Sequence, residues 1–213
     1  MERTLIALDP KTTAVVAIDM HRGHLDPSVA TMPLSVESCE RVIAAARSLF
    51  GALRERAIPI VHVMTRYRDP GEAAANPFWK AIADDPRMKR GSNLRHNLDG
   101  MPGTEVIPSL LGPGDIVVDT KKRYDCFYGT DLDFVLRRRL RAEALILAGV
   151  NTNSCVMCTA FEAQVRDYAV IIAADCVDTM DGEEMNRFAL RNLAATVGWV
   201  LGNDELLNVW RSR

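Results

Sequence analysis

Three side chains of complementary chemistry each follow a short apolar run in this 213-residue sequence. Asp19 ends the first such run, Lys121 comes just past the third and Cys155 lies a few residues past the fourth. A thiol, a carboxylate that can take its proton and an ammonium that can hold both anions are the parts needed for acyl transfer. Cys155 also stands where a helix should begin, a position that stabilises a thiolate. The residues therefore predict nucleophilic attack by sulfur on a carbonyl carbon.

The elements that must position these side chains alternate along the chain. Apolar runs that we expect to be strands lie at 13–18, 59–64, 115–119, 144–148, 169–173 and 198–201. Apolar residues recur with helical spacing at 34–57, 131–141, 154–168 and 182–195. This alternation predicts an α/β fold, a single-domain parallel Rossmann-like sheet of about six strands with helices on both faces, spanning residues 1–213. Ligands bind such sheets outside the carboxyl ends of the strands, where all three reactive residues lie.

A polar, proline-dotted segment at 67–114 is too long for an ordinary connection, and we expect it to cover a site. Arg66, Asn76, Trp79 and Tyr124 are then candidates for contact with substrate. Their cations and amides could grip a carboxylate or ureido oxygen, and their aromatic rings could exclude water. The alternative for each residue is a solvated loop side chain.

Composition excludes several classes of function. The sequence holds 26 Lys and Arg against 28 Asp and Glu, so no basic excess favours nucleic acid as a partner. It has neither the apolar core of a signal peptide at its start nor a run of about 20 apolar residues. We therefore expect a cytoplasmic protein with a small-molecule partner and no membrane contact.

The five cysteines form an odd set that does not suggest a disulfide framework. Cys155 and Cys158 have C-x-x-C spacing, which leaves open a thiol oxidoreductase or half of a zinc site. A second ligand pair is missing, and Cys158 should face away from Cys155 or into the core. The remaining three are expected to be buried apolar side chains: Cys39, Cys126 and Cys176.

The four histidines are too scattered in the sequence for their spacing to indicate a ligand cluster. They are His21, His24, His62 and His96. His24 follows the first strand closely enough to line a pocket there, but structural or surface roles are expected for all four. The sequence accordingly predicts no metal site and no cofactor.

Three motifs, in this order, resemble those of the isochorismatase-like cysteine hydrolases. They are VVAIDM at 15–20, KKRYDCFYGTDL at 121–132 and AGVNTNSCV at 148–156. The family includes nicotinamidases, N-carbamoylsarcosine amidases, biuret hydrolases and ureidoacrylate amidohydrolases, and the resemblance extends over nearly the whole chain.

The resemblance assigns a role to each reactive residue. It makes Cys155 the nucleophile, Asp19 the proton acceptor and Lys121 the organising cation. It further implies a cis peptide bond between Val150 and Asn151, with the backbone N–H groups of Asn151 and Cys155 forming an oxyanion hole.

The family pattern also decides between two adjacent lysines. Its lysine stands two residues before an arginine and six before a phenylalanine, so Arg123 and Phe127 select Lys121 over Lys122. Nicotinamidases bind a metal through an Asp-x-His arrangement after the second strand. This chain reads VMTRY at 63–67 instead, which again implies no metal site.

The resemblance implies an amidohydrolase that cleaves a C–N bond of a small amide or ureide through a thioester. Ureidoacrylate and N-carbamoyl compounds are the expected substrate types, and a homo-oligomer, a dimer or tetramer, is the expected assembly. A nicotinamidase-like hydrolase, a ligand-binding member of the fold without activity and a C-x-x-C oxidoreductase remain as alternatives.

Overall fold

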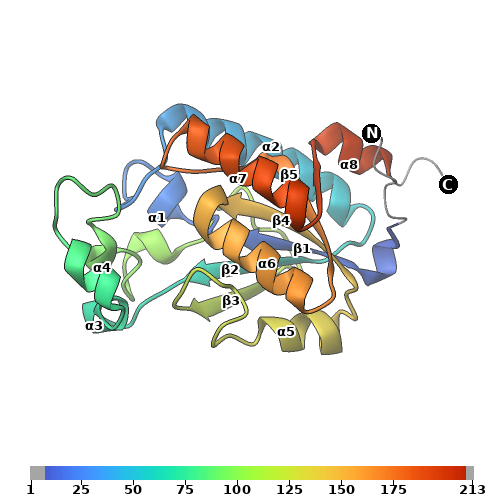
Figure 1. Ribbon diagram of the computed structural model, residues 1–213. Coiled ribbons are helices and arrows are strands. Elements are labelled where there is room, and N and C mark those ends of the chain that lie inside the picture. The colour runs from blue at the N-terminus through green and yellow to red at the C-terminus, as the bar shows by residue number, and fades with distance from the viewer. Residues whose placement is uncertain (1–7, 210–213) are drawn as a thin grey trace.

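One parallel sheet organises the protein in the computed structural model, which describes residues 8–209. Within that range six strands lie in the order β3-β2-β1-β4-β5-β6, all mutually parallel (Figure 1). This confirms the predicted fold class. The strands are β1 (Thr13–Ile18), β2 (Ile60–Thr65), β3 (Ile116–Lys121), β4 (Ala144–Val150), β5 (Ala169–Asp178) and β6 (Trp199–Leu201).

Helices cover both faces of the sheet because the buried strands alternate side chains between two apolar cores. In β1, Val15 and Ala17 face the core under α2 and α8, whereas Val16 and Ile18 face the core under α5, α6 and α7. The helices are α1 (Arg22–Leu25), α2 (Val36–Arg54), α3 (Pro70–Ala74), α4 (Pro77–Ile82), α5 (Leu132–Phe134), α6 (Met157–Val165), α7 (Glu183–Thr196) and α8 (Asn203–Asn208).

Two expected helices are interrupted at their ends by wider turns. The predicted helix at 131–141 is α5 followed by a π-helical turn, Val135–Arg139. The predicted helix at 154–168 begins as another π-helical turn, Thr152–Val156, and continues as α6. Such turns often occur at functional sites, and the second one contains Cys155.

The strand order reverses between β1 and β4, which lie side by side at the centre of the sheet. Glycine at position 149 allows β1 and β4 to lie this close together. Its φ is +122°, and a Cβ at this position would lie 2.0 Å from the carbonyl oxygen of Ile18. The residues that follow β1 and β4 therefore meet at one point. Crevices of this kind are the ligand sites of open parallel sheets.

The long segment after β2 lies beyond the carboxyl ends of the strands, where Figure 1 shows α3 and α4. It carries more structure than its composition suggested, namely α3, α4 and two short 3₁₀ turns, Asn93–Arg95 and Pro102–Thr104. The backbone of Tyr67 exchanges hydrogen bonds with Asn97 and Asp99, which fastens the segment back to the end of β2. Among the helices of residues 8–209, none has the length and apolar character needed to cross a membrane.

Candidate active site

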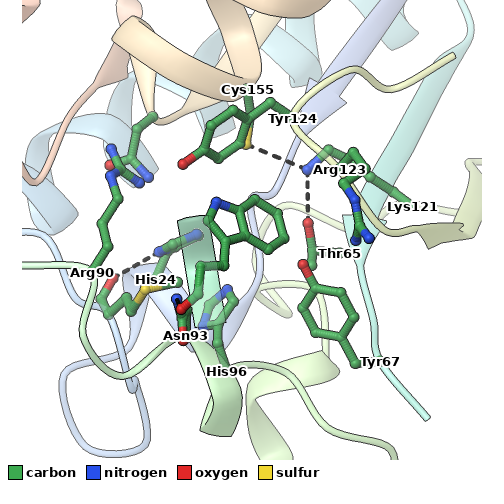
Figure 2. Close-up of a pocket in the computed structure, with 13 residues that line it drawn as sticks. His24, Thr65, Tyr67, Arg90, Asn93, His96, Lys121, Arg123, Tyr124 and Cys155 are labelled. Atoms are coloured by element: carbon green, nitrogen blue, oxygen red, sulfur yellow. Dashed lines mark hydrogen bonds between the residues drawn. The ribbon is translucent and has the colours of Figure 1, made fainter. Parts of the chain in front are cut away.

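The ammonium group of Lys121 joins the candidate base to the candidate nucleophile. Its Nζ lies 2.5 Å from Asp19 Oδ2, 2.7 Å from Thr65 Oγ1 and 3.4 Å from Cys155 Sγ. An ammonium has three N–H donors, so these contacts use all of them. Figure 2 shows Lys121 between Thr65 and Cys155. The structure thus brings together the three residues that the sequence predicted.

Strand register explains this convergence. Lys121 ends β3 directly opposite Thr65 at the end of β2, and Asp19 follows the last residue of β1. The Asp19 N–H donates to the carbonyl of Val63, and Asp19 Oδ1 accepts from the Thr65 N–H at 2.7 Å. Asp19 also has a φ of +50°, a left-handed conformation that aspartate tolerates better than most residues. The carboxylate is therefore held by backbone as well as by Lys121.

Sequence reasoning missed Thr65, although a signal for it existed. Thr65 is the last residue of an apolar strand, exactly as Lys121 is, and the same strand-end argument would have placed it at the site. Its hydroxyl accepts from Lys121, which fixes the direction of the ammonium between two elements.

The buried ion pair shifts the pKa values of both partners. Burial alone would raise the pKa of Asp19, but the charge of Lys121 and a hydrogen bond with His21 outweigh it and hold that pKa well below the usual value. Burial would likewise lower the pKa of Lys121, but Asp19 and Cys155 hold it well above the usual value. Both groups are therefore charged at neutral pH.

The Cys155 thiol differs from what its place at the start of a helix suggested. Burial raises its pKa to about 12, and the nearby charge of Lys121 offsets only part of that effect. The expectation of a stabilised thiolate in the free protein is therefore wrong. The side chain is only 5% exposed, so its loss of solvation exceeds what the charge of Lys121 restores.

The turn that carries Cys155 has the backbone that the motif implied. The peptide bond between Val150 and Asn151 is cis. The side-chain oxygen of Asn151 accepts from the N–H of Met180 at 2.8 Å, which ties this turn to the end of β5. Within residues 8–209 the backbone N–H of Asn151 has no hydrogen-bond acceptor, as an oxyanion donor requires.

A cavity opens onto the thiol between the strand ends and the covering segment (Figure 2). Its walls combine aromatic rings with cations, since Arg123 stacks over Trp79 and Arg90 over Tyr124. The two rings themselves lie 5.4 Å apart. The lining residues are His24, Met32, Thr65, Tyr67, Trp79, Arg90, Asn93, His96, Lys121, Arg123, Tyr124, Asn151 and Cys155.

Comparison with known proteins shows the family to which the chain belongs. Residues 13–205 match the family model described as the isochorismatase domain. The chain belongs to the isochorismatase family. Among curated relatives, the ureidoacrylate amidohydrolase RutB of Methylobacterium radiotolerans is 31% identical over 204 residues, covering 92% of this chain and 78% of that protein.

Solved structures show the same fold. A cysteine hydrolase from Pseudomonas syringae pv. phaseolicola superposes with a TM-score of 0.83 at 24% identity, covering 100% of this chain and 99% of that one. The N-carbamoylsarcosine amidase of Thermoplasma acidophilum superposes with a TM-score of 0.71 at 25% identity, covering 91% and 98%.

Two of the four residues expected at the substrate lie elsewhere in this member of the isochorismatase family. Arg66 forms ion pairs with Asp99 and Asp119 in a separate surface hollow. The side chain of Asn76 caps α4 and faces an adjacent groove. Neither side chain lines the cavity, so a substrate contact by either one lacks geometric support. The other two, Trp79 and Tyr124, do line it.

Three of the histidines that looked scattered in the sequence lie together beside the cavity. Nitrogen atoms of His21, His24 and His96 fall within 4.8 Å of one another, and all three rings are buried. The expectation that the histidines form no cluster is therefore wrong. Burial lowers the pKa of His24 to about 3 and that of His96 well below its usual value. Asn97 Nδ2 lies 2.7 Å from the Nε2 of His21, and this ring nitrogen also lies 3.5 Å from Asp19 Oδ1.

Lys122 and Cys158, which lie close in sequence to Lys121 and Cys155, do not line the cavity. Lys122 pairs with Glu72, so the choice of Lys121 as the site lysine is consistent with the geometry. Cys158 lines the groove beside Asn76 rather than the cavity of Cys155. Cys39, Cys126 and Cys176 are buried free thiols, as expected.

Proposed function

We propose that the protein is a cysteine-dependent amidohydrolase that cleaves a C–N bond of a small amide or ureide. The observation that carries the proposal is the Lys121 ammonium, which touches a buried carboxylate and a buried thiol at the floor of a cavity. The 31% identity to a ureidoacrylate amidohydrolase supports the choice of C–N bonds. The separate position of Cys158 gives no support to a dithiol oxidoreductase.

The first half of the reaction forms an S–C bond and breaks the C–N bond. Because the thiol is protonated at neutral pH, its proton moves to Asp19 as sulfur attacks the carbonyl carbon. The oxyanion then lies against the N–H groups of Asn151 and Cys155. The carbonyl re-forms, Asp19 returns the proton to the leaving nitrogen, and ammonia or an amine departs. Lys121 stays charged and keeps Asp19 in place.

The second half restores the enzyme. Water attacks the thioester carbonyl while Asp19 takes one of its protons, and the C–S bond breaks. The proton passes from Asp19 to the departing sulfur, which regenerates the thiol. In the resting protein the ion pair with Lys121 lowers the pKa of Asp19, which makes the carboxylate a weak base. The proton affinity of Asp19 must therefore increase during the attack, as negative charge moves from sulfur to the carbonyl oxygen.

The cavity favours a substrate with a negative charge. Of its lining residues, Lys121, Arg90 and Arg123 are cationic and none is a carboxylate. Lys121 and Arg90 are paired with Asp19 and Asp181, whereas Arg123 donates only to backbone carbonyls among residues 8–209. An acidic ureide would bring the missing negative charge, and Arg123 rather than Arg66 is the residue placed to hold it.

Ammonia release from a panel of ureides and primary amides tests the proposal. Cys155→Ala should abolish turnover, and acid trapping of the wild-type protein with substrate should give a mass adduct on Cys155. Cys158→Ala is the matched control and should retain both activity and adduct. Near wild-type turnover by Cys155→Ala, or an adduct on Cys158, would refute the mechanism.

A further inference from the structure

Three residues that line the cavity each have a buried polar side-chain atom without a hydrogen-bond partner. These atoms are Asn93 Oδ1, His96 Nε2 and Asn151 Nδ2, on side chains that are 6%, 3% and 1% exposed. A buried polar group without a partner costs about 1–3 kcal/mol, so proteins rarely leave three around one cavity. Their common position points to a ligand that supplies the missing partners.

Each of the two asparagine side chains, Asn93 and Asn151, forms one hydrogen bond with the protein backbone, and this bond determines which amide atom remains free for a ligand. Asn93 Nδ2 donates to the carbonyl of Trp79 at 2.8 Å, so its Oδ1 is the free atom and can only accept. Asn151 Oδ1 accepts from the Met180 N–H at 2.8 Å, so its Nδ2 is the free atom and can only donate. Exchanging oxygen and nitrogen in either amide would break these bonds. The cavity therefore offers one defined acceptor and one defined donor.

We propose that Asn93 and Asn151 form a specificity subsite that reads the N–H and C=O groups of the substrate's ureido or amide unit. Asn93 Oδ1 accepts from a substrate N–H, and Asn151 Nδ2 donates to a substrate oxygen. The inference rests on the proposed function and goes further, because it requires a hydrogen on the chain nitrogen of the ureido unit, the nitrogen that carries the rest of the substrate. Esters, carbamates lacking that N–H and tertiary amides would leave Asn93 unsatisfied.

The two asparagines lie on different parts of the chain. Asn93 belongs to the covering segment and is tied to α4 through Trp79, whereas Asn151 belongs to the turn that carries Cys155. Asn93 and His96 both line the cavity (Figure 2). A ligand that satisfies both therefore bridges the covering segment and the nucleophile turn.

The test compares two ligands that differ by one atom, 3-ureidopropanoate and its carbamate analogue in which oxygen replaces the chain N–H. Binding is measured by calorimetry to the Cys155→Ala protein, so the result does not depend on turnover. The ureido acid should bind at least about tenfold more tightly than the carbamate. Asn93→Leu should reduce this preference to within about twofold, and an unchanged preference would overturn the proposal.

Two further variants separate recognition from structure. Asn93→Asp keeps the acceptor but loses the bond to Trp79, so it should retain the preference. Loss of the preference in both Asn93 variants would assign the effect to the Trp79 contact and overturn the proposal. Asn151→Asp keeps the bond from Met180 but loses the donor, and should weaken both ligands about 10- to 100-fold. Equal affinity before and after that change would overturn the role of Asn151.

Asn186→Leu is the matched control, since its Oδ1 is also buried without a partner but lines a different hollow. It should change neither affinity. Failure of the proposed function is recognised separately. A wild-type protein that releases no ammonia from any ureide would refute the hydrolase, whereas active protein with an Asn93-independent preference would refute only the subsite.

Discussion

Replacing Lys121 with methionine should strongly destabilise the protein, because it leaves Asp19 buried without its counter-charge. The two side chains are 1% and 0% exposed, and Nζ lies 2.5 Å from Oδ2. At an effective dielectric constant of about 20, that distance corresponds to an attraction of about 7 kcal/mol. Desolvation of both ions offsets part of it, and removal of one partner from a buried pair costs about 3–5 kcal/mol. We expect a loss in that range.

Urea unfolding at pH 7 of the wild type, Lys121→Met, Asp19→Asn and the double variant measures the pair directly. The double variant should be more stable than Lys121→Met, because it no longer buries an isolated charge. The coupling free energy between the two positions should be at least about 3 kcal/mol. A loss below about 1 kcal/mol in Lys121→Met, or additive effects in the double variant, would refute the reasoning.

The same cycle has a pH dependence with a defined sign. Folding lowers the pKa of Asp19, so its contribution to stability is complete above the unfolded pKa of about 4 and is lost as pH falls through the folded value. In Lys121→Met the buried carboxylate has no counter-charge, so its pKa should rise above the unfolded value and this variant should instead regain stability as pH falls through the raised pKa. Unfolding curves between pH 3 and 7 check this shift.

Three other outcomes follow from the structure. Burial raises the pKa of Cys155 to about 12, so its alkylation by iodoacetamide should be slow at pH 8. The alkylation rate should increase with every pH unit above 8, and a rate that levels off near pH 7 would contradict this. The pKa of His24 is lowered to about 3, so stability should fall by a few kcal/mol as pH drops from about 6.5 toward 3, and His24→Gln should flatten that slope in unfolding curves. Arg66→Ala should leave kcat/KM for acidic and neutral amides unchanged, because Arg66 lies outside the cavity. Arg123→Gln should lower kcat/KM about tenfold or more for the acidic substrate alone, because Arg123 lines the cavity.

The strand ends of the site could be predicted because they depend on local pattern and simple topology. Apolar runs located β1, β3 and β4, and parallel strands place the residues after them at one edge. Asp19, Lys121 and Cys155 followed from that rule, and their order matched a known family. Thr65 obeys the same rule, but a threonine carries no charge that would mark it as a reactive group.

The covering segment could not be predicted, because its side chains are placed by contacts distant in sequence. Arg66 directly follows β2, yet Asp99 and Asp119 draw it away from the cavity, and Arg90 reaches the cavity through a bond to Asp181. His21 and His96 meet across 74 intervening residues for the same reason. A local sequence pattern does not predict contacts between residues that are so far apart along the chain. The pKa of the thiol could not be predicted either, because burial, which sequence spacing cannot measure, outweighs the charge of Lys121.

The pairing of Lys121 with Asp19 closes a loop of 102 residues along the chain. Cys155 reaches the pair only when β4 lies beside β1, so the complete site depends on contacts that are distant in sequence. A nascent or partly folded chain with β1 to β3 in place would hold an acid–base pair without a nucleophile. The complete site therefore requires β1 to β4 together, and in refolding experiments recovered activity would report the assembled sheet.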